Sequence, residues 1–270
     1  MGPSQGCWYY SLVAYRAGPG TMKKLIRNFL IGIASIVALL FGLLFYSFSQ
    51  TLPVTEHRQL SGGAVQVKDG LDSVGMIPSG DHRVALVDCG DDPQANAIMS
   101  ELNQRGLEKE AVQAILITHA HPDHVAGCAV FSGAEIFAMA AEQPLLEGRV
   151  AAHSVAGRLM GKNKSVIHAT RYLQDGDSFQ VGNLAVTAYL VPGDTDGSAA
   201  YLAAGTLYLG DSADGGKNGK LLPAKGLVSN DVQQNRDSLY KLAQTLRPQA
   251  AQIQFMEFAH SGRLWESGHF

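Results

Sequence analysis

Cysteine is scarce in this chain, with only Cys7, Cys89 and Cys128 among 270 residues. An odd and sparse count excludes a small scaffold held together by disulfides. Cys89 follows an apolar run and Cys128 lies one helical turn past His124, so both are expected to be small buried hydrophobic residues. A Cys89–Cys128 disulfide would suit an oxidising compartment, and the spacing alone leaves it open.

Charge is also scarce: 17% of the residues are charged and the net charge is -3. No run of Lys and Arg suggests a groove that follows a phosphate backbone, so nucleic acid is not an expected partner. The sequence shows no internal repeat and no low-complexity tract. With 46% hydrophobic residues, its composition is that of one large globular domain with an appendage.

The appendage is an uncharged apolar run at residues 29–48. At about 1.5 Å per residue, it is long enough to span a hydrocarbon core of about 30 Å. The run is preceded by the basic residues Lys23, Lys24 and Arg27. The positive-inside rule then places the following domain outside the cytoplasm, which is the periplasm in a bacterium. Small residues before Gln50 leave cleavage of a signal peptide open, and the domain would then be secreted.

Three segments are therefore expected along the chain. Residues 1–21 precede Met22-Lys23-Lys24, which resembles a normal start, and are interpreted as a mis-start or tail. Residues 22–50 form a membrane anchor or signal segment, and residues 57–270 form the globular domain.

Beyond residue 57, short β-rich runs alternate with helical stretches. The expected strands are Ala64–Lys68, Ser73–Ile77, Arg83–Asp88, Gln113–Thr118, Glu135–Ala138, Leu184–Val191, Ala199–Ala203, Thr206–Leu209 and Ile253–Met256. The expected helices are Asp92–Arg105, Val125–Phe131, Ala140–Gly148 and Val232–Leu246. Two groups of strands with helices outside them indicate a layered α/β fold.

The residues that carry chemistry gather in Thr118-His119-Ala120-His121-Pro122-Asp123-His124, at the end of a buried strand. Strand ends are where α/β sheets present functional side chains. Imidazole is a common metal ligand, and a carboxylate beside it suits zinc, iron or manganese. His119 and His121 can point to the same side of an extended backbone, and Pro122 then turns the chain. The stretch predicts a metal site.

This stretch resembles the His-x-His-x-Asp-His signature of the metallo-β-lactamase superfamily, and the resemblance extends over about residues 63–262. Three shorter segments fit the family's order, namely Val87-Asp88-Cys89-Gly90, Tyr208-Leu209-Gly210-Asp211 and Ala259-His260-Ser261-Gly262. The resemblance implies a four-layer αββα sandwich, here preceded by an N-terminal apolar helix. It also implies that the site lies at one edge of the paired sheets.

The resemblance further implies two divalent metal ions and their ligands. His119 and His121 would bind the first ion, and Asp211 would bridge the two. The second ion would be bound by Asp123, His124 and His260. Zinc is the expected metal, with manganese or iron as alternatives.

One segment departs from the family pattern. Relatives read Pro-Gly-His-Thr-x-Gly-Ser where this chain reads Pro192-Gly193-Asp194-Thr195-Asp196-Gly197-Ser198, so Asp194 replaces the third histidine of the first site. A carboxylate can still ligate, and the added negative charge would make bound water less acidic and favour harder ions. Two alternatives stay open: a single metal ion, or an Asp194 that is only a turn residue. Thr195 and Ser198 are expected to support the ligands.

The metals imply the chemistry. A divalent ion lowers the pKa of bound water from about 15.7 to about 7, and Asp123 is the candidate catalytic residue that orients or deprotonates this nucleophile. The predicted function is hydrolysis of an ester, thioester, lactone or amide of a small molecule, β-lactams included. The loops at about 140–175 and 212–231 are expected to form the pocket walls. Alternatives are an iron-dependent oxidoreductase on the same fold and a membrane-tethered binding protein weakened at Asp194.

Overall fold

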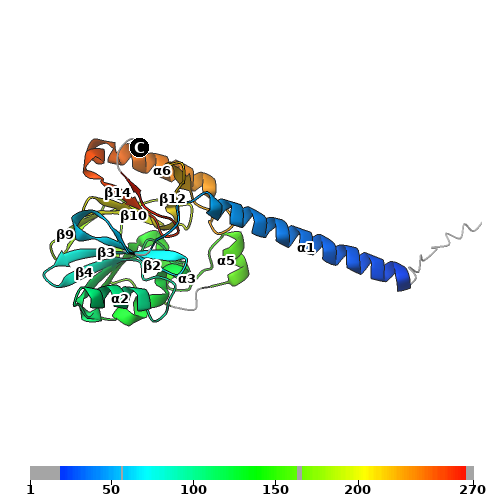
Figure 1. Ribbon diagram of the computed structural model, residues 1–270, viewed down its shortest axis with the longest axis horizontal. Coiled ribbons are helices and arrows are strands. Elements are labelled where there is room, and N and C mark those ends of the chain that lie inside the picture. Colours follow the sequence, from blue (N-terminus) through cyan, green and yellow to red (C-terminus); the bar gives the residue numbers. More distant parts are fainter. Residues whose placement is uncertain (1–18, 56, 163–165, 266–270) are drawn as a thin grey trace, which may run out of the picture. The chain divides into compact units, whose positions relative to one another are not determined.

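The computed structural model describes residues 19–55, 57–162 and 166–265 (Figure 1). The chain divides into two compact units, Met1–Tyr46 and Ser47–Phe270. Of the predicted segments, residues 1–18 lie outside the described residues, and so does Cys7.

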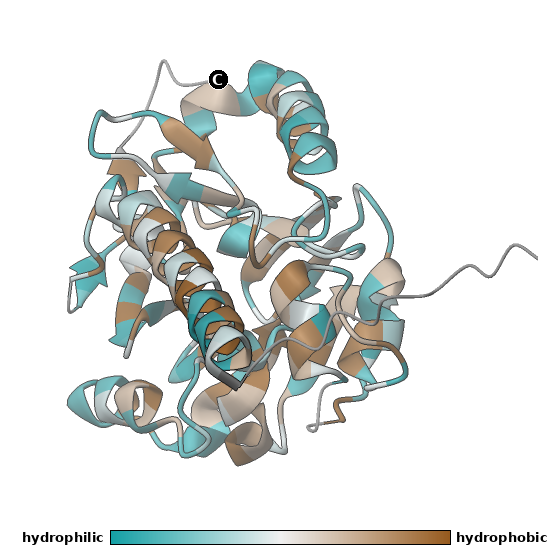
Figure 2. Ribbon diagram, turned by 90° about the vertical axis from the view of Figure 1, so that its right-hand side faces the viewer, coloured by the Kyte–Doolittle hydropathy of each residue, from teal (hydrophilic) through white to brown (hydrophobic). Residues whose placement is uncertain are grey.

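The first unit holds most of helix α1 (Pro19–Ser49). Its most apolar stretch has a mean hydropathy of 2.5, and its long aliphatic and aromatic side chains are exposed. Figure 2 shows the brown, hydrophobic stretches along this helix. At about 1.5 Å per residue the helix is long enough to cross a membrane. A signal sequence meets the same criteria of length and composition.

The second unit contains a seven-stranded sheet in which neighbouring strands are consecutive along the chain. Strands β1 to β4 pair antiparallel, whereas β4 to β7 pair parallel. The strands are β1 (Arg58–Gln59), β2 (Val65–Asp69), β3 (Asp72–Gly80), β4 (Arg83–Val87), β5 (Val112–Leu116), β6 (Glu135–Met139) and β7 (Arg171–Leu173). The parallel half therefore directs the carboxyl ends of four strands to one edge.

A second sheet has six strands in the order β15-β14-β11-β10-β9-β8. Its strands are β8 (Ser178–Val181), β9 (Leu184–Leu190), β10 (Ala199–Ala203), β11 (Thr206–Tyr208), β14 (Phe255–Glu257) and β15 (Leu264–Trp265). Only β11 and β14 pair parallel in this sheet. A separate hairpin joins β12 (Ala213–Gly215) and β13 (Leu221–Pro223).

Helices cover the outer faces of both sheets, which gives the four layers predicted from the family resemblance. Helix α2 (Asn96–Gln104) covers the seven-stranded sheet and α6 (Val232–Leu246) covers the six-stranded one (Figure 1). Three clusters of buried side chains fill the three spaces between layers. Alternation along β4 explains this: Leu86 packs under the helices, and Val87 packs between the sheets.

Among the described residues, three shorter α-helices and several 3-10 helices complete the fold. The α-helices are α3 (Pro122–Val125), α4 (Gln143–Leu146) and α5 (Val155–Met160), and the longest 3-10 helices are η3 (Ala126–Phe131) and η6 (Arg247–Gln252). The helix predicted over residues 125–131 is thus a 3-10 helix that follows a single α-helical turn. The prediction missed α5 and the short strands β1, β7, β8, β12, β13 and β15.

The helix predicted to start at Asp92 begins instead at Asn96. The Asp92 carboxylate accepts hydrogen bonds from the backbone N–H groups of Gln94 and Asn96, and these bonds stabilise a turn before the helix. The last predicted strand, Ile253–Met256, begins two residues later and ends one residue later in the structure, at Phe255–Glu257. By contrast, α6 has the predicted bounds, and the Asp231 carboxylate caps its first turn.

Cys89 and Cys128 are joined by a disulfide. Both are buried, as predicted. The simpler expectation, that they are only small hydrophobic residues, is wrong, and the disulfide that their spacing left open is present. It links the loop after β4 to η3.

Candidate metal centre

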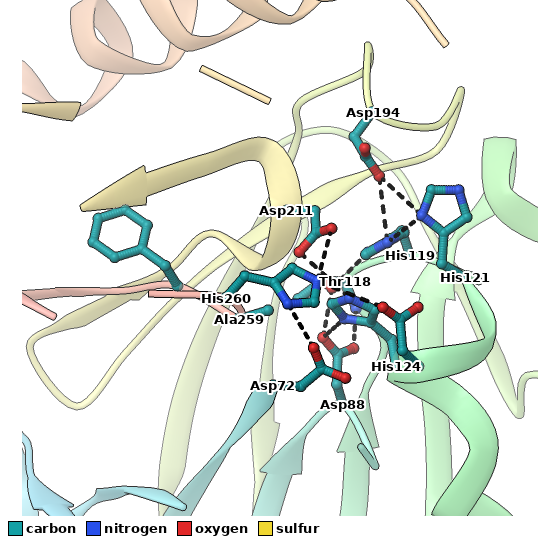
Figure 3. Close-up of polar contacts among 12 residues, drawn as sticks. Asp72, Asp88, Thr118, His119, His121, His124, Asp194, Asp211, Ala259 and His260 are labelled. Carbon is teal, nitrogen blue, oxygen red and sulfur yellow. Dashed lines mark hydrogen bonds and ion pairs between the residues drawn. The ribbon is translucent and has the colours of Figure 1, made fainter. Parts of the chain in front are cut away.

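The predicted ligands all follow the carboxyl ends of strands. His119, His121, Asp123 and His124 follow β5, Asp194 follows β9, Asp211 follows β11 and His260 follows β14. Because β11 and β14 are parallel neighbours, Asp211 and His260 leave the second sheet at the same edge. The structure brings all seven residues together at one edge of the paired sheets, and Figure 3 labels all of them except Asp123.

A close backbone approach joins the two sheets at this edge. Gly210 has a φ of +51°, and a Cβ at this position would lie 2.5 Å from Thr118 Oγ1. Only glycine permits both that conformation and that distance. The residue after Gly210 is Asp211 and the residue after Thr118 is His119, so this contact brings ligands from different sheets together.

The first group of candidate ligands consists of His119, His121, Asp194 and Asp211, whose ligand atoms lie within 4.8 Å of one another. His119 Nε2 lies 2.8 Å from His121 Nδ1. Asp194 Oδ2 lies 3.3 Å from the former and 3.5 Å from the latter. Asp194 belongs to a turn, but its carboxylate points into the cluster (Figure 3).

The second group consists of Asp123, His124 and His260, also within 4.8 Å. His260 Nε2 lies 3.5 Å from Asp123 Oδ2. Asp211 connects the groups, because its Oδ1 lies 3.4 Å from His124 Nε2 and its Oδ2 lies 3.2 Å from His260 Nε2. One carboxylate therefore faces both sets of ligands.

The donor atoms fit divalent cations. Among the described residues, the buried atoms that lack a hydrogen-bond partner include His124 Nε2, Asp194 Oδ2 and Asp211 Oδ1. A buried polar atom without a partner costs about 1–3 kcal/mol. All three point into the cluster, where a bound ion would satisfy them. Nitrogen and carboxylate donors together suit zinc, iron and manganese.

Asp88 orients His124 of the second group. Its carboxylate accepts hydrogen bonds from Thr118 N at 2.7 Å and Thr118 Oγ1 at 2.6 Å, and it lies 2.8 Å from His124 Nδ1. With Nδ1 donating to Asp88, Nε2 of His124 keeps its lone pair for a metal. Asp88 has a φ of +62°, a conformation that costs a non-glycine residue of the order of 1 kcal/mol and that the surrounding bonds must maintain.

Asp72 has the same relation to His260, because its Oδ1 lies 2.6 Å from His260 Nδ1. Sequence reasoning missed this residue, which sits at the start of β3, far from every motif. It also missed Ser229, whose hydroxyl donates to Asp194 Oδ1 at 2.7 Å and leaves Oδ2 facing the histidines. No short-range signal marks either residue, because each reaches its ligand only through the tertiary fold.

Glu142, also missed, supports the ligands from behind. Its Oε1 accepts from Ala120 N, between the first two histidines, at 2.7 Å. Its Oε2 accepts from Thr195 Oγ1 at 2.8 Å and from Gly197 N at 3.0 Å. Ser198 Oγ in turn accepts from Thr195 N. Thr195 and Ser198 therefore shape the turn that presents Asp194.

Burial and nearby charges shift the pKa values of His119 and His124, one from each group, in opposite directions. Burial and the neighbouring His124 and His121 hold the pKa of His119 well below its ordinary value, which gives the neutral form that ligates metals. Burial alone would also lower the pKa of His124, but the carboxylates of Asp211 and Asp88 raise it well above the ordinary value. The carboxylates that stabilise a proton there would equally stabilise a cation.

A cavity of about 240 Å³ opens onto these ligands. We call it the metal pocket. It is lined by Phe48, Leu71, Asp72, Asp91, His121, Pro122, Asp123, Ser154, Ala156, Met160, Asp211, Lys225, Val228 and His260. Parts of both predicted wall loops contribute, 140–175 through Met160 and 212–231 through Val228. Lys225 is paired with Asp214 and also lies 4.5 Å from the centre of the Phe48 ring.

Comparison with known proteins identifies the family. The model of the metallo-beta-lactamase superfamily matches residues 68–245, well over half of the chain. The chain belongs to the metallo-β-lactamase superfamily. His260 lies beyond the matched range, and its place in the cluster comes from the structure.

Curated relatives of this superfamily member have more than one activity in their names. The hydroxyacylglutathione hydrolase of Aeromonas salmonicida (strain A449) is 30% identical over 165 residues, covering 60% of this chain and 53% of the relative. The ribonuclease Z of Methanopyrus kandleri is 30% identical over 135 residues, covering 48% and 43%. The chain thus spans about half the length of the curated relatives it matches.

Solved structures show the same fold at low sequence identity. A B3 metallo-beta-lactamase with an active-site glutamic acid has a TM-score of 0.60 at 19% identity, covering 83% of this chain and 87% of the other. A subclass B3 metallo-beta-lactamase of Bradyrhizobium japonicum has a TM-score of 0.55 at 22% identity, covering 78% and 79%. These likenesses confirm the four-layer fold.

Proposed function

We propose that this superfamily member hydrolyses an ester, thioester, lactone or amide of a small molecule, with two zinc ions bound at the cluster. The observation that carries the proposal is the pair of ligand groups joined by Asp211 and opening onto the metal pocket. His119, His121 and Asp194 would hold one ion, and Asp211 would bridge to the other. Asp123, His124 and His260 would hold that second ion.

The ions, when bound, would supply Lewis acidity and lower the pKa of water. The protein's own contribution is to position reactants. The Asp123 side chain is 38% exposed and lines the metal pocket. Burial alone would raise the pKa of Asp123, but the contact with His260 holds it below its ordinary value. Asp123 is therefore ionised at neutral pH and accepts a hydrogen bond from the attacking water, which it orients toward the substrate.

The relatives support hydrolysis without selecting the substrate. Their names include a hydroxyacylglutathione, a ribonuclease activity and β-lactams. The low net charge of -3 favours a small molecule over nucleic acid. We propose that α1 anchors the protein and that the basic residues before it place the hydrolase outside the cytoplasm. The Cys89–Cys128 disulfide supports an oxidising compartment.

Metal analysis together with a substrate panel tests the proposal. The full chain is purified anaerobically, its metal content is measured, and thioesters, lactones and β-lactams are assayed with and without a chelator. We expect two zinc ions per chain and a hydrolysis that the chelator abolishes and zinc restores. Iron with oxygen consumption would instead indicate an oxidoreductase. Bound metal without turnover of any substrate in the natural chain, together with turnover in Asp194→His, would indicate a binding protein whose activity is weakened at Asp194.

A further inference from the structure

A second cavity, of about 380 Å³, adjoins the metal pocket. We call it the apolar hollow. It is lined by His121, Pro122, Val125, Ala126, Leu145, Ala152, Gly157, Met160, Gly161 and Lys162. Three of these residues, His121, Pro122 and Met160, also line the metal pocket, so the two cavities share a wall. Apart from His121 and Lys162, every lining side chain within the described residues is apolar or absent.

The space exists because small residues form its floor against α5. The Ser154 hydroxyl caps α5 by accepting a hydrogen bond from Gly157 N at 2.9 Å. A Cβ on Gly157 would lie 2.6 Å from the Cβ of Ala152, so glycine is needed for this close approach. Ala126 and Ala152 add no bulk beyond Cβ. A ligand-sized space of a few hundred Å³ therefore remains beside His121.

The mouth of the hollow keeps an apolar side chain exposed. Met160 lines the hollow and is 65% exposed. Ligand pockets are lined mainly by apolar side chains, so an exposed one at a cavity is available to a ligand. Because Met160 lines both cavities, a ligand held at the metal pocket would extend along it into the hollow.

We propose that the apolar hollow binds the acyl chain of the substrate and makes this hydrolase selective for acyl groups longer than acetyl. The inference rests on the proposed function, since the reacting carbonyl would sit at the metal pocket. The leaving group would then point away from His121, toward Lys225 and Val228 on the opposite wall loop. Each methylene group that is fully buried should multiply kcat/KM by about four, which corresponds to roughly 0.8 kcal/mol.

The test uses the full chain, loaded with zinc in lipid nanodiscs, and p-nitrophenyl acetate, butyrate and hexanoate, which share one leaving group. We expect kcat/KM to rise at least tenfold from acetate to hexanoate. Met160→Asp places a charge on the shared wall and should reduce this ratio to threefold or less. The matched control is Leu159→Asp, on the neighbouring position that lines neither cavity, and it should keep the natural ratio.

Product binding provides a readout independent of turnover. Calorimetry with hexanoate and acetate should show hexanoate binding at least tenfold more tightly, with a negative heat-capacity change that reports apolar burial. Met160→Asp should remove that difference. Equal kcat/KM values for all three esters, or the same loss of chain-length preference in both variants, would overturn the inference while leaving hydrolysis intact. Absence of any hydrolysis would refute the proposed function, and the binding comparison would still decide the role of the hollow.

Discussion

Removal of the Cys89–Cys128 disulfide should destabilise the protein strongly. The two cysteines are 39 residues apart in the sequence. In the chain-entropy model, a cross-link closing a loop of that length stabilises the native state by about 4 kcal/mol. A typical domain has a free energy of unfolding of about 5–15 kcal/mol. The disulfide would therefore account for a large share of the stability.

The same change should also weaken metal binding at the site. Cys89 N donates to the carbonyl of His124 at 2.7 Å, and Cys89 follows Asp88, which orients the imidazole of His124. Ligands oriented less firmly bind metal less tightly, and a loss of 10- to 100-fold is typical when such support is removed. We expect this loss for the ion held by His124.

The assay compares two full-length proteins, the parent and the double variant Cys89→Ala/Cys128→Ala. Both carry Cys7→Ser, so that thiol counts report the disulfide alone. Urea unfolding should show a loss of about 2–4 kcal/mol, and reductant should lower the stability of the parent but not of the double variant. Under denaturing conditions without reductant, the parent should have no reactive thiol. Two reactive thiols, or a stability difference below about 1 kcal/mol, would refute the reasoning.

Three further predictions concern the site and its support. Asp194→Ala should reduce the bound metal, measured by plasma emission spectroscopy, from two ions to one per chain, whereas Asp196→Ala, at an exposed neighbour in the same turn, should keep both. Glu142→Gln replaces one of the two buried carboxylate oxygens by an NH2 group that cannot accept a hydrogen bond, and it should lower the free energy of unfolding in urea by about 1–3 kcal/mol. The first ion should also bind more weakly, and an unchanged metal affinity would refute the positioning role of Glu142. Burial raises the pKa of Glu257 from 4.5 to about 8, so the folded state binds this proton more tightly, and the resulting stability is full below pH 4.5 and lost as the pH rises to about 8. Glu257→Gln should flatten this decline by a few kcal/mol at most, and identical pH profiles for both proteins would contradict the assignment.

Much of the fold could be predicted from the sequence because the relevant signals are local. The helix predicted at Val232–Leu246 has those bounds, since Asp231 is a strong cap and the apolar periodicity is regular. The strand Ala199–Ala203 is likewise as predicted. Short edge strands such as β1 and β15 have two residues each and carry no periodicity, so only pairing with a neighbour defines them.

The candidate ligands were predictable for a different reason. His119 to His124 are adjacent in sequence, and Asp211 and His260 each sit in a short motif with the family's order. Asp72 and Ser229 have no such context, because their roles depend on partners 188 and 35 residues away. The sequence spacing of Cys89 and Cys128 left the prediction of a disulfide open, because the bond requires the loop after β4 to lie beside η3. Only the tertiary structure establishes that contact.

Asp194 makes the strongest case that the cluster is built for cations. Its side chain is fully buried, and burial raises the pKa of its carboxyl. One oxygen accepts from Ser229, while the other lacks a hydrogen-bond partner within the described part of the chain and faces His119 and His121. Such an arrangement is costly unless a positive charge compensates it. Two divalent ions would bring four positive charges against the three carboxylates of Asp123, Asp194 and Asp211, so the replacement of histidine by Asp194 lowers the net positive charge of the loaded site by one. The carboxylate therefore strengthens the attraction for the first ion and weakens the acidification of its water, two effects that a histidine at this position would reverse together.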